Sequence, residues 1–215
     1  MGSQLAKSAR SNTLSVRDEL AALKRERILD AATHLFGERG YHGTSMEAIA
    51  DALGATKPFV YYQFQDKADL LTAICSKGAD LSLEAARNAV ESGLDPAESF
   101  RAFCLALAKI VIAYGPYVSV YAREMSNLPA QARRAIEKKR AEIDRLAATM
   151  IAEGAKCELF DCEDALLQAR AITGMISYMH MWHRDRAGVD QEQLAQQITT
   201  IAMRTLVKSR LDRQA

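Results

Sequence analysis

The chain has 215 residues, of which 49% are hydrophobic and 26% are charged, the ordinary mixture of a globular protein. Lys and Arg number 28 against 27 Asp and Glu, so the formal net charge of +1 gives no sign of a nucleic-acid partner. This composition excludes the collagen-like, low-complexity and disordered classes. The length suits one large domain or two small ones.

The sequence offers no obvious membrane-directed segment. The most apolar run, 103–114, contains Lys109 and is too short to span a bilayer. The N-terminus lacks the apolar core of a signal peptide. No C-x-x-C pair occurs among the cysteines, which are Cys75, Cys104, Cys157 and Cys162. We therefore expect a cytoplasmic protein with reduced thiols and no membrane partner.

Apolar residues recur at helical spacing along the chain, and the strict alternation typical of strands is rare. The first predicted helix begins near Ser15 and ends at Gly40, a residue that can take the left-handed conformation at a helix C-terminus. Residues 1–15 are expected to form a flexible arm. Alternatively, Lys7 and Arg10 of this arm reach into a minor groove of DNA.

Two short helices separated by a tight turn are predicted next. The pattern Thr44-x-x-Glu47 is that of a capping box and starts the first of them, which ends at Gly54. Thr56 can cap the second, and Pro58 lies in its first turn, where no intrahelical hydrogen bond is lost. This is the helix-turn-helix plan, whose second helix fits a major groove of DNA.

The candidate DNA-binding residues are exposed side chains of the second short helix and polar groups beside it. They are Thr44, Ser45, Thr56, Lys57, Pro58, Phe59, Tyr61, Tyr62, Gln63 and Lys67. Lys57 and Gln63 can donate to base edges, and Phe59 can contact a thymine methyl group. The hydroxyl groups and Lys67 suit phosphates.

Within this helix, the side chains of Val60, Tyr61 and Phe64 are expected to lie inward or at the backbone. An alternative is that the aromatic residues form a small helical core without DNA contacts. From Val16 to Leu70 the chain carries seven basic and nine acidic residues. DNA binding here must rest on a few placed cations, so we expect a shallow dependence of affinity on salt.

A fourth helix is predicted to start at Asp66, which can cap it. Longer helices follow, with expected ranges 96–114, 117–127, 130–154, 161–185 and 190–211. Because short helices give way to long ones near residue 66, we expect a helix-turn-helix domain over 16–66 and a helical bundle over 67–215. The predicted fold class is all-α, with about nine helices.

A dense set of short motifs lies between Lys24 and Ile74. These motifs are Arg27-Ile28-Leu29-Asp30-Ala31-Ala32, Leu35-Phe36, Gly40-Tyr41, Thr44-Ser45, Ile49-Ala50, Leu53-Gly54, Tyr61-Tyr62-x-Phe64 and Lys67-x-x-Leu70-Leu71. Together they resemble the DNA-binding signature of the TetR family of one-component repressors. The pair Pro58-Phe59 stands where members often have Gly or Thr, which affects the expected operator rather than the fold.

The resemblance implies an all-helical homodimer that binds a palindromic double-stranded DNA operator. It also implies that residues 67–215 form a ligand-binding and dimerisation domain, and that a small-molecule effector releases the protein from DNA. The effector would shift the population toward a conformation that does not bind DNA, acting through the fourth helix.

Two stripes in the last two predicted helices indicate a dimer interface. Small residues recur at four-residue spacing in the first, and apolar residues form a stripe on the second. The expected interface residues are Ala169, Thr173, Ser177, Leu194, Ile198 and Ile201. Two such helices from each chain would form a four-helix interface. The alternative is ordinary packing within one chain.

The candidate ligand-binding residues are aromatic, apolar and basic side chains of the middle and later helices. They are Phe103, Leu107, Tyr114, Tyr121, Arg123, Arg170, Met175, Tyr178 and Trp182. The apolar ones would equally belong to the core of any helical bundle. Arg170 lies in an otherwise apolar helix, so we expect it to be buried beside either a carboxylate of the chain or an anionic ligand.

The segment from Glu153 to Trp182 resembles the branch of the TetR family that responds to acyl-CoA thioesters. This resemblance implies an apolar channel for the acyl group and basic side chains for the phosphates. The long helix offers such side chains, unless they only form a solvated face: Arg133, Arg134, Lys138, Lys139 and Arg140. The alternative effector is a hydrophobic drug or another small molecule, with control of efflux.

Motifs of enzymes are missing: the sequence has no G-x-S-x-G, H-E-x-x-H, P-loop or G-x-G-x-x-G pattern. His180 and His183 have the spacing of a metal pair, but no third ligand stands at motif spacing. We therefore expect a DNA-binding regulator without catalytic residues, metal or cofactor. The remaining alternative is a helical scaffold that does not bind DNA.

Overall fold

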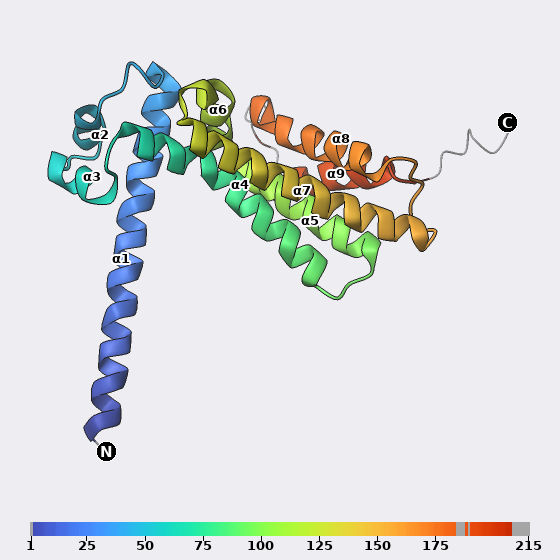
Figure 1. Cartoon of the computed structure of the whole chain (residues 1–215), viewed down its shortest axis with the longest axis horizontal. Helices are drawn as coiled ribbons and strands as arrows, with labels where there is room; N and C mark the ends of the chain where they lie inside the picture. Colours follow the sequence, from blue (N-terminus) through green and yellow to red (C-terminus); the bar gives the residue numbers. More distant parts are fainter. Residues whose placement is uncertain (1, 184–187, 189, 208–215) are drawn as a thin grey trace. The chain divides into compact units, whose positions relative to one another are not determined.

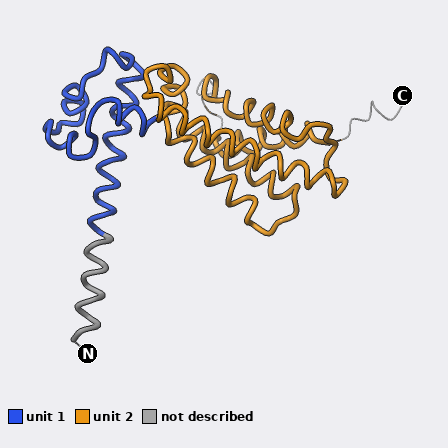
Figure 2. The backbone as a smooth tube through the Cα atoms, viewed as in Figure 1, with its two compact units in different colours: residues 1–74 blue, residues 75–215 orange. Residues whose placement is uncertain are grey.

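The computed structural model describes residues 2–183, 188 and 190–207, with side chains described from Val16 onward. Two compact units make up the chain, Met1–Ile74 and Cys75–Ala215 (Figure 2). The described part contains nine α-helices and no strand (Figure 1). This confirms the predicted all-α class and the expected number of helices.

Unit 1 is built from α1 (Gly2–Arg39), α2 (Met46–Ala52), α3 (Lys57–Gln63) and the beginning of α4 (Lys67–Glu91). Its large side chains with almost no exposure come from all four helices, and they include Ile28, Phe36, Ile49, Val60, Phe64, Leu70, Leu71 and Ile74. The first turns of α4 belong to this core, so the unit ends at Ile74 and not at residue 66, where the sequence pattern suggested a boundary.

Helix α1 begins at Gly2, well before the predicted start near Ser15. After Gly2, neither Gly nor Pro occurs before Gly37, so no helix-breaking residue interrupts this segment. The side chains of residues 2–15 lie outside those described. The expected arm over 1–15, with Lys7 and Arg10, therefore stays a prediction.

Unit 2 contains the rest of α4 and the helices α5 (Pro96–Ala113), α6 (Gly115–Glu124), α7 (Ala130–Lys156), α8 (Ala165–Ser177) and α9 (Gln191–Arg204). Helix α5 is central, because it packs against α7, α8 and α9. Its buried residues include Phe100, Phe103, Cys104, Leu107 and Val111, which form one hydrophobic core with side chains of the surrounding helices.

Aspartate side chains cap the beginnings of several helices. Asp66 accepts a hydrogen bond from the Asp69 backbone at 2.8 Å, and Asp190 caps α9, both as predicted. Helix α8 starts after Asp164, whose carboxylate accepts bonds from two backbone amides. It ends at Ser177, earlier than expected, and a 3₁₀ turn, η2 (Tyr178–Met181), follows.

A second 3₁₀ turn, η1 (Met125–Asn127), follows α6. Helix α9 also ends earlier than expected, at Arg204 and not at residue 211, because the chain turns at 205–207.

No single helix of the described residues is both long and apolar enough to cross a membrane. The helices Pro96–Ala113 and Gly115–Asn127 reach the required length and composition only as a pair, bent by 79°.

Candidate DNA-binding surface and effector cavity

The N-terminus of α2 is capped by Ser45 and not by Thr44. The Ser45 hydroxyl accepts a hydrogen bond from the Ala48 backbone at 3.1 Å. The Thr44 hydroxyl instead donates to the carbonyl oxygen of Gly40 at 2.9 Å and lies 3.2 Å from that of Leu35. Thr44 is buried. The expectation that Thr44 caps this helix is therefore wrong, and its hydroxyl is already bonded within the chain.

The turn between α2 and α3 depends on Gly54, whose φ angle of 60° lies in the left-handed region. The Ala55 backbone amide bonds to the Ala50 carbonyl at 3.0 Å and closes the end of α2. Thr56 is the N-cap of α3, although its side chain makes no capping hydrogen bond. Pro58 lies in the first turn, as the sequence predicts.

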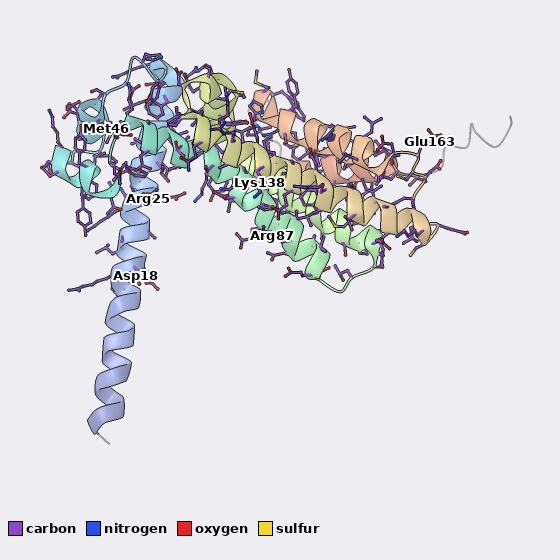
Figure 3. The ribbon with its side chains drawn as sticks, viewed as in Figure 1. Asp18, Arg25, Met46, Arg87, Lys138 and Glu163 are labelled. Atoms are coloured by element: carbon purple, nitrogen blue, oxygen red, sulfur yellow. The ribbon has the colours of Figure 1, made fainter. Side chains whose placement is uncertain are left out.

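Arg25 of α1 holds the end of α3. Its Nη1 donates to the carbonyl oxygen of Gln63 at 2.9 Å, and its guanidinium lies over the Phe64 ring at 4.0 Å from the centroid. Figure 3 shows Arg25 on α1 and Met46 on α2 in this unit. Sequence reasoning missed this role. The available signal was the position of Arg25 on the same helix face as Ile28 and Ala32.

The outer face of α3 carries most of the candidate DNA-binding residues. Thr56, Lys57 and Pro58 are exposed, and Phe59 and Gln63 are partly exposed. Tyr62 is 86% exposed and Tyr61 is 46% exposed. Val60 and Phe64 are buried, as expected; Tyr61 does not lie inward, which leaves the other expected position, at the DNA backbone, as a prediction.

Both candidate lysines have partners within unit 1. Lys57 Nζ lies 3.0 Å from Oε1 of Glu47, and both side chains are exposed. Lys67 Nζ donates to the carbonyl oxygens of Tyr41 at 2.8 Å and Thr44 at 2.9 Å, and it lies over the Tyr41 ring. Lys67 therefore fixes the segment between α1 and α2. The sequence suggested this residue only as a phosphate ligand.

A shallow recess lies beside α3 on unit 1. Its lining residues are His42, Gly43, Thr44, Ser45, Met46, Ala48, Tyr61, Asp66 and Lys67. The exposed hydroxyl groups of Ser45 and Tyr61 suit a phosphate group of DNA. The face of α3 and this recess together form a polar surface that a DNA backbone can contact.

Unit 2 contains a cavity of about 180 Å³ between α4, α5, α6, α7 and α8. Its apolar part is lined by buried side chains that include Leu107, Val111, Tyr117, Ile136 and Ile143. Helix α4 contributes Cys75, Gly78, Ala79 and Ser82. Burial, and then the charge of Glu124, raise the pKa of the Cys75 thiol to about 12, so this group is a neutral part of the wall.

The exposed edge of the cavity is charged. Arg170 Nε lies 3.3 Å from Oδ2 of Asp144, and the Thr173 hydroxyl donates to Oδ1 at 3.3 Å. The Arg140 guanidinium lies 5.4 Å from the centroid of the Tyr121 ring. Arg170 is 60% exposed, so the expectation of a buried arginine is wrong, although its carboxylate partner is present.

Of the candidate ligand-binding residues, Leu107, Tyr121 and Arg170 line this cavity. Others lie elsewhere. Phe103 is buried with its ring centroid 6.2 Å from that of Phe100, and Tyr114 contacts the ring of Tyr117.

Four further candidates also lie outside the lining. Arg123 pairs with Glu124 at 3.2 Å, Met175 and Trp182 pack against the hydrophobic core, and Tyr178 is exposed. Periodicity identifies apolar faces but does not separate the lining of a cavity from a filled core. Asp144 was not among the candidates, and Arg140 was named only as a possible phosphate partner, although both interrupt the apolar face of α7 that contains Ile136 and Ile143.

The expected dimer residues mostly face the core of their own chain. Ala169, Thr173, Leu194 and Ile198 are buried in the single chain, and Ser177 lines the cavity. Ile201 remains exposed. Exposed residues of α8 and the η2 turn follow another register: Leu167, Ala171, Gly174 and Tyr178.

Within the described residues, no group of three or more His, Cys, Asp and Glu side chains is arranged to hold a metal ion. The Nδ1 atoms of His180 and His183 lie 2.8 Å and 2.9 Å from the carbonyl oxygens of Ser177 and Met179. These contacts fix both rings against their own helical turns.

Comparison with known proteins agrees with the division of the chain into two units. Residues 28–74 match the family of bacterial regulatory proteins of the tetR family, and residues 93–206 match the tetracyclin repressor-like C-terminal domain. The transcriptional repressor KstR2 of Rhodococcus jostii is 26% identical over 182 residues, which are 84% of this chain and 89% of that protein.

The transcriptional activator FasR of Mycolicibacterium smegmatis is 36% identical over 86 residues, 40% of this chain and only 37% of its own length. The structure of AibR in complex with isovaleryl coenzyme A and operator DNA superposes with a TM-score of 0.68 and 26% identity, covering 83% of this chain and 97% of AibR. The chain therefore belongs to the TetR family of bacterial regulatory proteins.

Proposed function

We propose that this protein is a transcriptional repressor that binds a palindromic operator in the cytoplasm as a homodimer and leaves it when a small-molecule effector binds. The observation that carries the proposal is the cavity of unit 2, which is apolar inside and cationic at its exposed edge. The same chain contains, in unit 1, a helix-turn-helix whose second helix presents Lys57, Tyr62 and Gln63 outward. A regulator needs both parts: one to read DNA and one to sense a ligand.

The favoured effector is an acyl-CoA thioester with a short acyl group. A cavity of about 150 Å³ in another protein holds benzene, so the cavity of about 180 Å³ here suits an acyl group of similar size. The phosphates of the CoA portion would remain outside, near Arg140 and other basic side chains of α7 such as Arg134 and Lys138. The relative AibR, solved with isovaleryl coenzyme A, supports this assignment.

Dimerisation would use the exposed apolar surface of α8 with Ile201 of α9. Leu167 is 64% exposed, and Gly174 has no neighbouring atom within 4 Å of the place where a Cβ would lie, so another helix can approach closely. Two-fold symmetry would place two copies of α3 in successive major grooves, roughly 34 Å apart.

Helix α4 provides a path for the signal. Its residues Cys75, Gly78 and Ser82 line the cavity, whereas Lys67 at its start bonds to the segment that leads into α2. An effector that contacts α4 can therefore bias the position of the DNA-binding residues. It must bind the conformation that is off DNA more tightly in order to release the operator.

The DNA-binding part of the proposal is tested by selecting bound sequences from a random pool of duplex DNA with the full chain. We expect a palindrome whose half-sites lie one helical turn apart. Tyr62→Ala should weaken binding to the selected DNA at least tenfold, whereas Arg87→Ala, on an exposed part of α4 in unit 2, should leave it unchanged. Recovery of no common sequence, or equal binding by both variants, would contradict the proposal.

A further inference from the structure

Three charged side chains meet at the exposed edge of the cavity: Arg140 and Asp144 from α7 and Arg170 from α8. The two carboxylate oxygens of Asp144 face α8, where one lies 3.3 Å from Arg170 Nε and the other accepts the Thr173 hydroxyl at 3.3 Å. Asp144 therefore links α7 to α8, and only 23% of its side chain is exposed.

Arg140 lies one helical turn before Asp144 and also lines the cavity. Its guanidinium is placed over the Tyr121 ring, and no ion pair with a carboxylate is present for it among the side chains that the structure describes. The lining of this edge therefore carries two cations and one anion. The local excess of positive charge favours a ligand that carries a negative group next to its apolar part.

We infer that Asp144 holds Arg170 where the effector's anionic group would bind, and that an effector with an anion beside a small apolar group displaces it from Arg170. This inference rests on the proposed function and names the chemistry and the signal of its ligand site. When the ligand anion engages Arg140 and Arg170, the link from Asp144 to α8 is lost. Because α8 also carries the proposed dimer surface, its release is the event that the dimer can sense.

Asp144 is thus a positioning residue that also sets specificity. Its charge holds Arg170 and opposes any incoming anion, so removing the charge should favour anionic ligands and leave neutral ones unaffected. Asp144→Asn keeps an oxygen that can accept from Thr173 and Arg170, so the packing of α7 and α8 should be retained. The matched control is Glu142→Gln, because Glu142 lies on the same helix but pairs with Arg87, 2.6 Å away, and does not line the cavity.

The test is isothermal titration calorimetry of the full chain with two pairs of probes. Isovaleryl-CoA is compared with isovaleryl-pantetheine, which lacks the phosphates together with the adenosine, and isovalerate is compared with isovaleramide, which differs only in its charged group. The pair that shows the larger preference for its anionic member identifies the source of the anion, a CoA phosphate or a carboxylate. The measured quantity is the ratio of affinities within a pair, which a purely structural effect of a substitution would not change.

We expect wild type to prefer the anionic member of one pair, Asp144→Asn to raise that preference about tenfold, and Glu142→Gln to leave it unchanged. Arg170→Gln should reduce the preference toward parity. Equal ratios for wild type and Asp144→Asn would overturn the inference, as would wild type binding neither anionic probe. Binding of selected DNA by the same samples is measured in parallel, so that failure of the inference is distinguished from failure of the proposed regulator.

Discussion

The ammonium group of Lys57 lies 3.0 Å from Oε1 of Glu47, so the first residue of α3 is paired with α2 before any DNA is bound. The pKa of the Glu47 carboxyl lies below its usual range, first because its own backbone amide donates to it and then because Lys57 does. Lys57 can reach a phosphate or a base only by leaving or sharing this partner.

Glu47→Gln should therefore strengthen DNA binding. The substitution frees Lys57 and removes a negative charge from the surface, so we expect affinity to rise about threefold and the slope of log affinity against log salt to steepen by about 1. Fluorescence anisotropy over a range of salt concentrations measures both. The control is Glu38→Gln, since Glu38 is also exposed and pairs with His34 on α1. Equal effects of the two substitutions would show that only net charge matters.

The advantage of Glu47→Gln should vanish at acid pH. A carboxyl whose pKa is lowered in the folded state keeps its pairing above its ordinary pKa and loses it as the pH falls through the lowered value. Below that value, wild type and Glu47→Gln should bind DNA equally. Anisotropy titrations of both proteins at stepped pH measure the ratio of affinities, and a constant ratio across this range would refute the role of the pair.

Lys67 should stabilise unit 1 rather than mainly bind phosphate. Lys67→Ala leaves the carbonyl oxygens of Tyr41 and Thr44 without their charged donor, which should lower the free energy of unfolding by about 2 kcal/mol. Urea denaturation measures the change. The control, Lys57→Ala, removes an exposed ion pair and should change stability by less than about 0.5 kcal/mol. A stable Lys67→Ala protein that has lost DNA affinity would contradict this assignment.

Leu167→Glu should convert the proposed dimer into a monomer. A charge at this exposed position of α8 would be buried without a partner in a dimer, whereas the single chain tolerates it. Sedimentation velocity measures the oligomeric state. Leu94→Glu introduces the same charge at another exposed leucine, in the connection between α4 and α5, and should stay dimeric. A dimeric Leu167→Glu protein would place the interface on another surface.

The thiols should differ sharply in reactivity. Burial raises the pKa of Cys75 and of Cys104 to about 12, so at pH 8 about one in ten thousand of these groups is the reactive thiolate. Cys157 is exposed. Iodoacetamide followed by mass spectrometry should therefore label Cys157 in the folded protein, and Cys75 and Cys104 only after denaturation. Rapid labelling of Cys75 under native conditions would show that the cavity opens far wider than described.

The sequence was sufficient for the helices and for the helix-turn-helix, because spacing and turn residues act locally. Val60 and Phe64 lie inward as their positions predict, and Asp66 and Asp190 begin helices as expected. The sequence could not decide which of two neighbouring residues with similar chemistry takes a given role. Thr44 and Ser45 both can cap a helix, and only packing against the carbonyl oxygens of Leu35 and Gly40 decides that Ser45 does so.

Faces of helices were harder to predict than helices. On α8, the stripe through Ala169 and Thr173 and the stripe through Leu167 and Tyr178 both fit helical spacing, and the tertiary packing decides that the first is buried. The pair of Asp144 and Arg170 joins residues far apart in the chain, so no local pattern could identify it. The charged edge of the cavity therefore emerges only from the fold.

Ligand binding in unit 2 should weaken DNA binding by unit 1. The most direct measurement is the affinity of the full chain for its selected palindrome, by fluorescence anisotropy, with and without saturating isovaleryl-CoA. We expect at least a tenfold loss of DNA affinity with this ligand and no change with free CoA. Calorimetric binding of isovaleryl-CoA without any change in DNA affinity would contradict it.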